Sequence, residues 1–104
     1  METFNVQEIN KLLKLWKGHI KFFKNDGVIT KIEFTKRYDF DMFSNGQESN
    51  GIVVAIEKVI NGYDFLKVVG DSKGITVIAT VKPQSLQDFK LYCSKLKNVE
   101  TLVS

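Results

Sequence analysis

Lysines alternate with large apolar side chains between residues 18 and 34, where the sequence reads GHIKFFKNDGVITKIEF. Proteins that bind single-stranded nucleic acid combine ammonium groups with an aromatic ring, because the charges follow the phosphates and the ring stacks on a base. Two further basic residues and a tyrosine follow at positions 36–38. The candidate nucleic-acid-binding residues are therefore Lys21, Phe23, Lys24, Lys31, Lys36, Arg37 and Tyr38.

Positive charge is concentrated in one part of the chain. The 104 residues carry a net charge of +3, but residues 11–37 hold eight basic and two acidic side chains, a local charge of +6 that leaves −3 for the rest. An anionic partner for this stretch is one interpretation, and an ordinary solvated surface is the other. Fourteen of the fifteen basic residues are lysines, which contact phosphate as point charges. Any nucleic-acid binding should therefore have low sequence specificity.

Residues suited to catalysis or metal binding are scarce. The single histidine, His19, and the single cysteine, Cys93, lie in different segments without a catalytic signature, so we predict no enzyme activity. These two residues cannot complete a zinc site, and no phosphate-binding glycine loop is present, so we expect no metal and no cofactor. A lone cysteine fits a reducing cytoplasm, and the longest apolar run, residues 52–56, is too short to cross a membrane.

The length predicts a single domain, 1–104, with a helix near each end. The first helix is expected at 5–17, with Asn5 as its N-cap and Gly18 as its C-terminal glycine. The second is expected at 86–97, with Ser85 as its cap. Their apolar stripes at helical spacing are Val6, Ile9, Leu12, Leu13 and Trp16, and then Leu86, Phe89, Cys93 and Leu96.

Between the helices the apolar period changes to two, which predicts strands joined by short turns. The expected strands are 19–24, 28–40, 52–60, 65–70 and 75–82, with a longer polar loop at 44–51 and a short edge strand at 99–103. Short connections favour antiparallel neighbours, so we predict an α+β fold: a five-stranded antiparallel sheet curled toward a small barrel. This element order is similar to that of Sm-like barrels, whose Asn-Gly turn falls near residues 25–27. The rest of that family's motif does not match in spacing, so we infer no membership.

The first hairpin has two possible registers. A three-residue loop at 25–27 would pair Lys21 with Lys31 and leave Phe23 and Ile29 beside them on the outer face. The inner face would then carry Ile20, Phe22, Val28, Ile32 and Phe34. A two-residue loop at Asp26-Gly27 would shift the register by one and separate these residues. A helix covering Phe23 would also make the ring inaccessible to a base. Lys36 falls in the buried phase, which predicts a bulge near it.

These patterns lead to two functional hypotheses. The first is a small cytoplasmic, non-enzymatic accessory protein that binds RNA or single-stranded DNA with little sequence preference. The alternative is a protein-interaction or regulatory module, such as phages and mobile elements encode, which docks through a sheet edge and has no nucleic-acid role. Neither hypothesis places the protein in a membrane.

Overall fold

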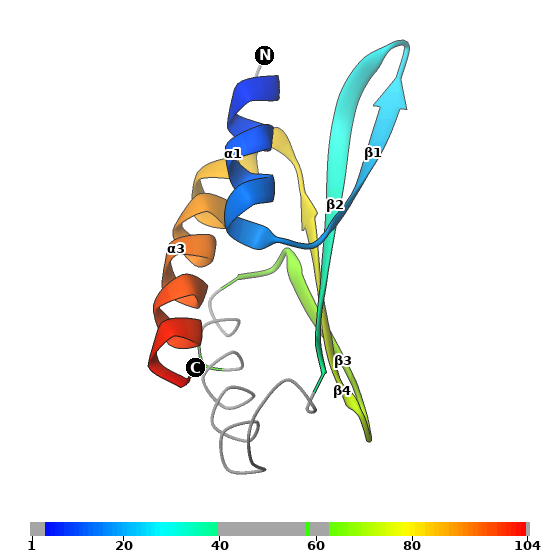
Figure 1. Cartoon of the computed structure of the whole chain (residues 1–104). Helices are drawn as coiled ribbons and strands as arrows, with labels where there is room; N and C mark the ends of the chain where they lie inside the picture. Colours follow the sequence, from blue (N-terminus) through cyan, green and yellow to red (C-terminus); the bar gives the residue numbers. More distant parts are fainter. Residues whose placement is uncertain (1–3, 40–57, 59–62, 104) are drawn as a thin grey trace.

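The computed structural model describes residues 4–39, 58 and 63–103, with side chains described through residue 98. Two α-helices lie next to one another on one face of an antiparallel sheet (Figure 1). In chain order the elements are α1 (Val6–Trp16), β1 (His19–Asn25), β2 (Val28–Asp39), β3 (Leu66–Asp71), β4 (Gly74–Val81), the short 3₁₀ helix η2 (Pro83–Ser85) and α3 (Leu86–Val103).

The sheet has four strands in the order β1-β2-β4-β3, and all neighbouring pairs are antiparallel. The predicted α+β class and four of the predicted strands are confirmed. The sheet is open, with β1 and β3 as its edges, so the expected small barrel is wrong. The predicted loop at 44–51 lies outside the described residues. So does the predicted strand at 52–60 except for Lys58, whose backbone is helical.

Helix α1 begins as the sequence predicts and ends differently. The Asn5 side chain accepts hydrogen bonds from the backbone N–H groups of Gln7 and Glu8, at 2.8 and 3.4 Å. At the other end the left-handed residue is Lys17, with a φ of 55°, and not Gly18. Gly18 is required for a different reason: a Cβ atom there would collide with the carbonyl oxygen of Thr35 and lie 2.7 Å from the Trp16 ring.

Helix α3 is longer than predicted, because it continues to Val103. The expected edge strand at 99–103 is therefore wrong. No glycine or proline interrupts the chain after Pro83, and extending an existing helix is far easier than nucleating a new element. Ser85 is the last residue of η2 and not the expected cap of a separate helix. Within the described part of the chain, no helix is both long and apolar enough to cross a membrane.

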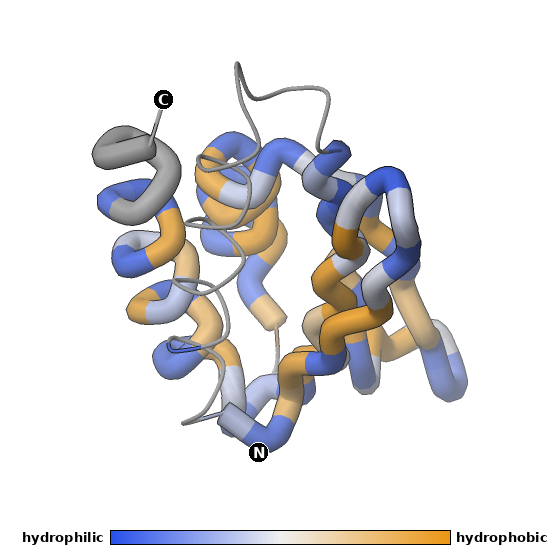
Figure 2. The backbone as a smooth tube through the Cα atoms, turned by 90° about the horizontal axis from the view of Figure 1, so that it is seen from below, coloured by the Kyte–Doolittle hydropathy of each residue, from blue (hydrophilic) through white to orange (hydrophobic). Residues whose placement is uncertain are grey.

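The core lies between the two helices and the sheet, where hydrophobic segments of both layers face each other (Figure 2). Trp16 is 1% exposed, as the apolar stripe predicts, and its ring lies 5.3 Å from Phe89 and 5.6 Å from Tyr92. Phe34 of β2 stacks on Phe89 at 4.6 Å. The buried hydrophobic residues are Ile9, Leu12, Trp16, Ile32, Phe34, Tyr38, Ile75, Val77, Ala79, Val81, Leu86, Phe89, Tyr92, Cys93 and Leu96.

The junction between α1 and β1 can be tested with two neighbouring variants. Gly18→Ala should lower the free energy of unfolding by about 1–3 kcal/mol, because the added Cβ overpacks the contact with Thr35 and Trp16. Lys17→Gly should leave it unchanged or raise it by up to about 1 kcal/mol, because a left-handed backbone is unfavourable for a side chain. Urea denaturation measures both. A Gly18→Ala variant as stable as the parent would contradict the described junction.

The contribution of Trp16 to stability can be tested by comparison with Leu15, an exposed neighbour on the same helix. Trp16→Ala should cost about 3–5 kcal/mol, most of the stability of a small domain, because it removes the ring around which Phe89 and Tyr92 pack. Leu15→Ala should change stability little, because Leu15 is 38% exposed. Thermal denaturation compares them, and equal melting temperatures for the two variants would show that α1 does not pack as described.

Candidate nucleic-acid interface

The turn of the first hairpin has two residues, so the three-residue loop is the wrong prediction. Asp26 and Gly27 have φ angles of 52° and 80°, the pair of positive values that a type I′ turn requires. Asn25 pairs with Val28 and Lys24 with Ile29. Asn25 is therefore the last residue of β1 and not part of the loop.

A bulge at Thr30 then changes the register. Phe23 pairs with Lys31, and Thr30 is left without a partner in β1, with its hydroxyl donating to the Phe23 carbonyl at 3.2 Å. The bulge reverses the faces of the two residues before it: Ile29 packs against the core, and Val28 is 51% exposed. Both residues were expected on the opposite faces. The expected pairing of Lys21 with Lys31 is also wrong, because Lys21 pairs with Glu33.

Phe23 lies on the face of the sheet opposite the helices, which we call the open face. Phe23 pairs with Lys31 of β2. Lys31 and Glu33 alternate along β2 with Ile32 and Phe34, which are buried against the helices, so Lys31 and its partner Phe23 face the other way. Both described α-helices lie on the opposite face of the sheet, so neither is the covering helix considered for Phe23 (Figure 1). The ammonium group of Lys31 lies 4.4 Å from the centre of the Phe23 ring and that of Lys21 lies 5.2 Å from it. These three residues form the aromatic and basic group that the sequence predicts.

Arg37 also lies on the open face, but its guanidinium group is already hydrogen-bonded to two carboxylates. Its Nε donates to Asp39 at 2.6 Å and its Nη2 to Asp71 at 3.2 Å, while Nη1 donates to the Thr76 hydroxyl at 3.2 Å. The hydrogen bond from Arg37 lowers the pKa of Asp71, and the two carboxylates raise the pKa of Arg37. Asp71 also accepts from the backbone N–H groups of residues 73 and 74. Arg37 therefore ties β2 to the β3–β4 turn.

Three predicted residues lie on the helix side of the sheet. Tyr38 is 3% exposed, so its ring has no surface on which a base could stack. Lys36 has its ammonium group 5.0 Å from the centre of that ring, and pairing with β4 is regular from Ile32 to Asp39, so the predicted bulge at Lys36 is absent. Lys24 alternates with Phe23 and pairs with Ile29, which places it on the same side.

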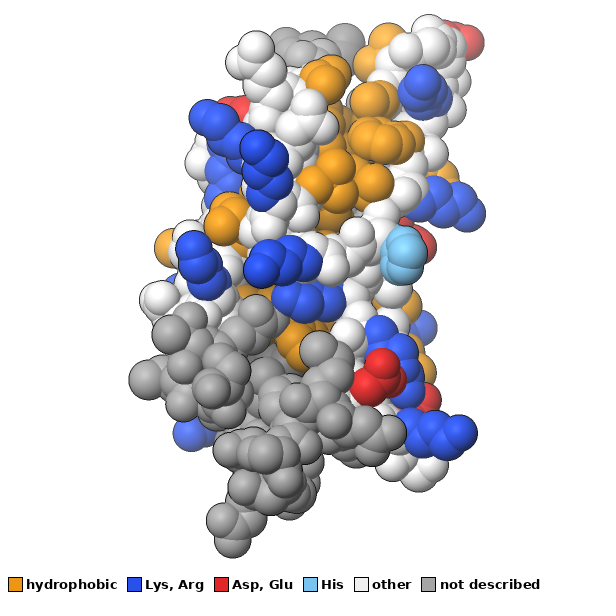
Figure 3. Space-filling view, viewed as in Figure 1, with side chains coloured by type: hydrophobic (Ala, Val, Ile, Leu, Met, Phe, Trp, Pro, Cys, Tyr) orange, Lys and Arg blue, Asp and Glu red, His pale blue; other side chains and the backbone are white. Residues whose placement is uncertain are grey.

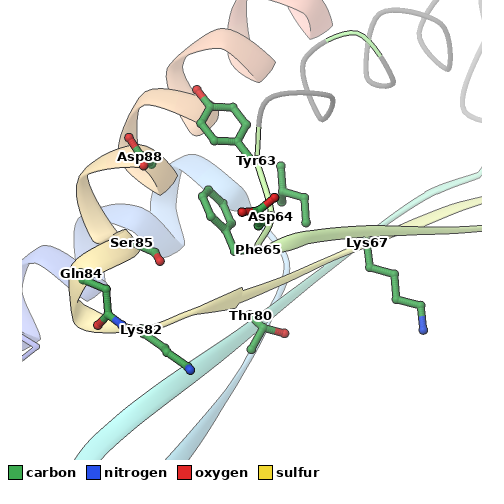
Figure 4. A pocket seen from close by; sticks show the side chains of 10 residues that line it. Tyr63, Asp64, Phe65, Lys67, Thr80, Lys82, Gln84, Ser85 and Asp88 are labelled. Atoms are coloured by element: carbon green, nitrogen blue, oxygen red, sulfur yellow. The ribbon is translucent and has the colours of Figure 1, made fainter.

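The open face continues over β4 and β3, which the sequence interpretation did not include. Ile78 of β4 pairs with Thr35 on one side and Lys67 on the other. Beside them is a pocket of about 550 Å³, where Lys67, Thr80 and Lys82 point away from α3 (Figure 4). Its other polar lining residues include Gln84, Ser85 and Asp88. The alternation of residues 75–82 indicates these positions, but only the strand order brings them beside the hairpin.

The two residues considered for catalysis, Cys93 and His19, do not form a catalytic pair. Cys93 is buried in α3, where burial raises the pKa of its thiol to about 12, so it stays protonated and is not a nucleophile. His19 is exposed and pairs with Thr35 at the edge of the open face. No cluster of three metal-ligating side chains occurs among the residues that the structure describes.

Comparisons with protein-family models, with curated proteins and with solved structures gave no match.

The thiol of Cys93 provides a test of the core described around α3. A disulfide reagent near pH 8 should modify native Cys93 only as fast as the protein opens, because the thiol is buried and protonated. In denaturant the reaction should be complete at the rate of a free thiol. Absorbance of the released thiolate measures both rates. Native labelling at the free-thiol rate would contradict the burial of α3.

Proposed function

We propose that the protein binds single-stranded RNA or DNA on the open face of its sheet, with little sequence preference. The observation that carries this proposal is the Phe23 ring on the helix-free face, with the ammonium groups of Lys21 and Lys31 within 5.2 and 4.4 Å of its centre. A ring that every base can stack on, beside charges that every phosphate attracts, gives affinity without base selection.

A base can compete with the two lysines as the partner of this ring. A lysine near an exposed aromatic ring contributes about 0.5–1 kcal/mol, so the two together contribute about 1–2 kcal/mol. Stacking of a base on such a ring contributes about 1–3 kcal/mol. An ammonium group that a base displaces from the ring is then free to contact a phosphate beside that base.

The rest of the open face would extend the surface that contacts the nucleic acid beyond Phe23. Thr35 of the hairpin pairs with Ile78, which pairs with Lys67, and Lys67 and Lys82 both line the pocket on either side of Thr80 (Figure 4). Four-stranded sheets that bind RNA hold two or three bases on such a face. Phe23 is the one Phe, Tyr or Trp ring that the four described strands place on this face, and Glu33 opposes Lys21, so both affinity and specificity should be modest.

A second candidate is a protein-interaction module. It is favoured by exposed apolar side chains on the other side of the same hairpin, among them Phe22, which is 43% exposed. The two functions are compatible, because they use opposite faces.

The nucleic-acid proposal predicts a specific salt dependence. Lys21→Gln combined with Lys31→Gln should weaken binding of a fluorescent single-stranded oligonucleotide and flatten the logarithmic salt slope by about one to two units, because two phosphate contacts are lost. Phe23→Ala should cost about 1–3 kcal/mol of binding. Anisotropy titrations with RNA and with DNA at several salt concentrations measure both effects.

The matched control removes the same charge from the helix layer. Lys11→Gln combined with Lys14→Gln, both on exposed positions of α1, should leave the salt slope unchanged. If the control and the open-face variant weaken binding equally, the protein attracts nucleic acid only through its net charge. If neither nucleic acid binds at low salt, the proposal is wrong.

A further inference from the structure

The helix side of the first hairpin carries an uncovered apolar surface. We call it the apolar strip and define it as Val6 and Leu13 of α1 with Ile20, Phe22 and Ile29 of the hairpin. Val6 is 64% exposed and Phe22 43% exposed, while the other three are partly buried against the core. In the space-filling view, hydrophobic side chains gather between α1 and the β1–β2 hairpin (Figure 3).

The strip is exposed because the helix layer stops before the end of the hairpin. Helices α1 and α3 cover the middle of the sheet, where Ile32 and Val77 are 0% exposed. Among the residues that the structure describes, no helix lies over the turn end of β1 and β2 (Figure 1). A sheet face bearing Ile20, Phe22 and Ile29 normally packs against another layer, so this side of the hairpin is suited to bind a helix that packs beside α1.

Lysines flank the strip on both sides. Lys24 follows Phe22 at the next position of the same face of β1, and it pairs with Ile29. On α1, Lys17 lies four residues after Leu13, and Lys14 lies further round the same side of the helix. Figure 3 shows basic side chains on either side of the hydrophobic surface.

Among the described residues, no acidic side chain forms an ion pair with these lysines. Glu8, the acidic residue of the first turn of α1, pairs with Lys90 of α3 at 2.9 Å and so lies on the side away from the hairpin. The charge around the strip therefore suits an acidic occupant.

We propose that the apolar strip is the docking site for an acidic amphipathic helix of a partner protein. Its apolar face would cover Phe22, Ile20 and Leu13, and carboxylates on its two flanks would lie near Lys24 and near Lys14 and Lys17. The seven residues of β1 extend over about 23 Å, the length of a helix of about 15 residues. The strip lies on the opposite side of the hairpin from Phe23, so this site is separate from the proposed nucleic-acid surface.

The probe is a fluorescent peptide of about 15 residues with leucines along one helical face and glutamates on both flanks. Anisotropy with the full chain should show saturable binding. Phe22→Gln and Val6→Gln should each weaken it, the former by about tenfold, because a central apolar anchor contributes that much. Val69→Gln is the matched control: Val69 is 48% exposed on β3, away from the strip, and its loss should not change binding.

Charge reversal tests the stated chemistry of the partner. Lys14→Glu combined with Lys24→Glu should weaken the glutamate peptide by about tenfold and allow a peptide with lysines in place of glutamates to bind instead. Lys21→Gln with Lys31→Gln should leave peptide binding unchanged, so this proposal and the nucleic-acid proposal can fail separately. Circular dichroism confirms that each variant is folded.

Four results would overturn the proposal. The first two are no binding of the glutamate peptide and equal binding of the glutamate and lysine peptides by the parent. The third is a dimer in sedimentation that Phe22→Gln dissociates, because the occupant would then be a second copy of this chain. The fourth is loss of oligonucleotide binding, and not peptide binding, in Phe22→Gln, which would assign the strip to the nucleic-acid surface.

Discussion

The two-residue turn at Asp26 and Gly27 constrains every later position of the hairpin. With that turn and a regular ladder, Phe22 would pair with Lys31 and Lys21 with Ile32, so the apolar residues of β1 and β2 would face opposite sides. The bulge at Thr30 adds one residue to β2 and restores Phe22 opposite Ile32, while Phe23 comes opposite Lys31. Turn and bulge together give the sheet one face for the helices and one for Phe23 and its lysines.

The elements of the fold follow from local patterns, and their register does not. Helical spacing identified Trp16 as core, and the period of two identified all four strands of the described sheet. The position of one residue in a turn could not be read, because Asn25-Asp26-Gly27 suits a loop of two or three residues equally well. The end of α3 was missed because residues 99–103 suit a helix or a strand, and continuity with the preceding helix decided between them.

Alternation along β1 and β2 was enough to group Lys21, Phe23 and Lys31, and it also placed Lys36 in the buried phase. The bulge expected near Lys36 is absent, because pairing with β4 continues past it and keeps Tyr38 in the core. The engagement of Arg37 by Asp71 joins residues far apart in the sequence, so no local pattern indicates it. The same alternation separates the two proposed surfaces, since neighbouring residues such as Phe22 and Phe23 belong to opposite faces.

The most direct test of this account is the hairpin register measured by NMR in solution. Cross-strand proton contacts should join Phe23 to Lys31 and Lys21 to Glu33, with Thr30 lacking a partner in β1. Contacts that join Lys21 to Lys31 and Phe23 to Ile29 would contradict the account. They would return Ile29 to the open face and remove it from the apolar strip, and both proposed surfaces would have to be redrawn.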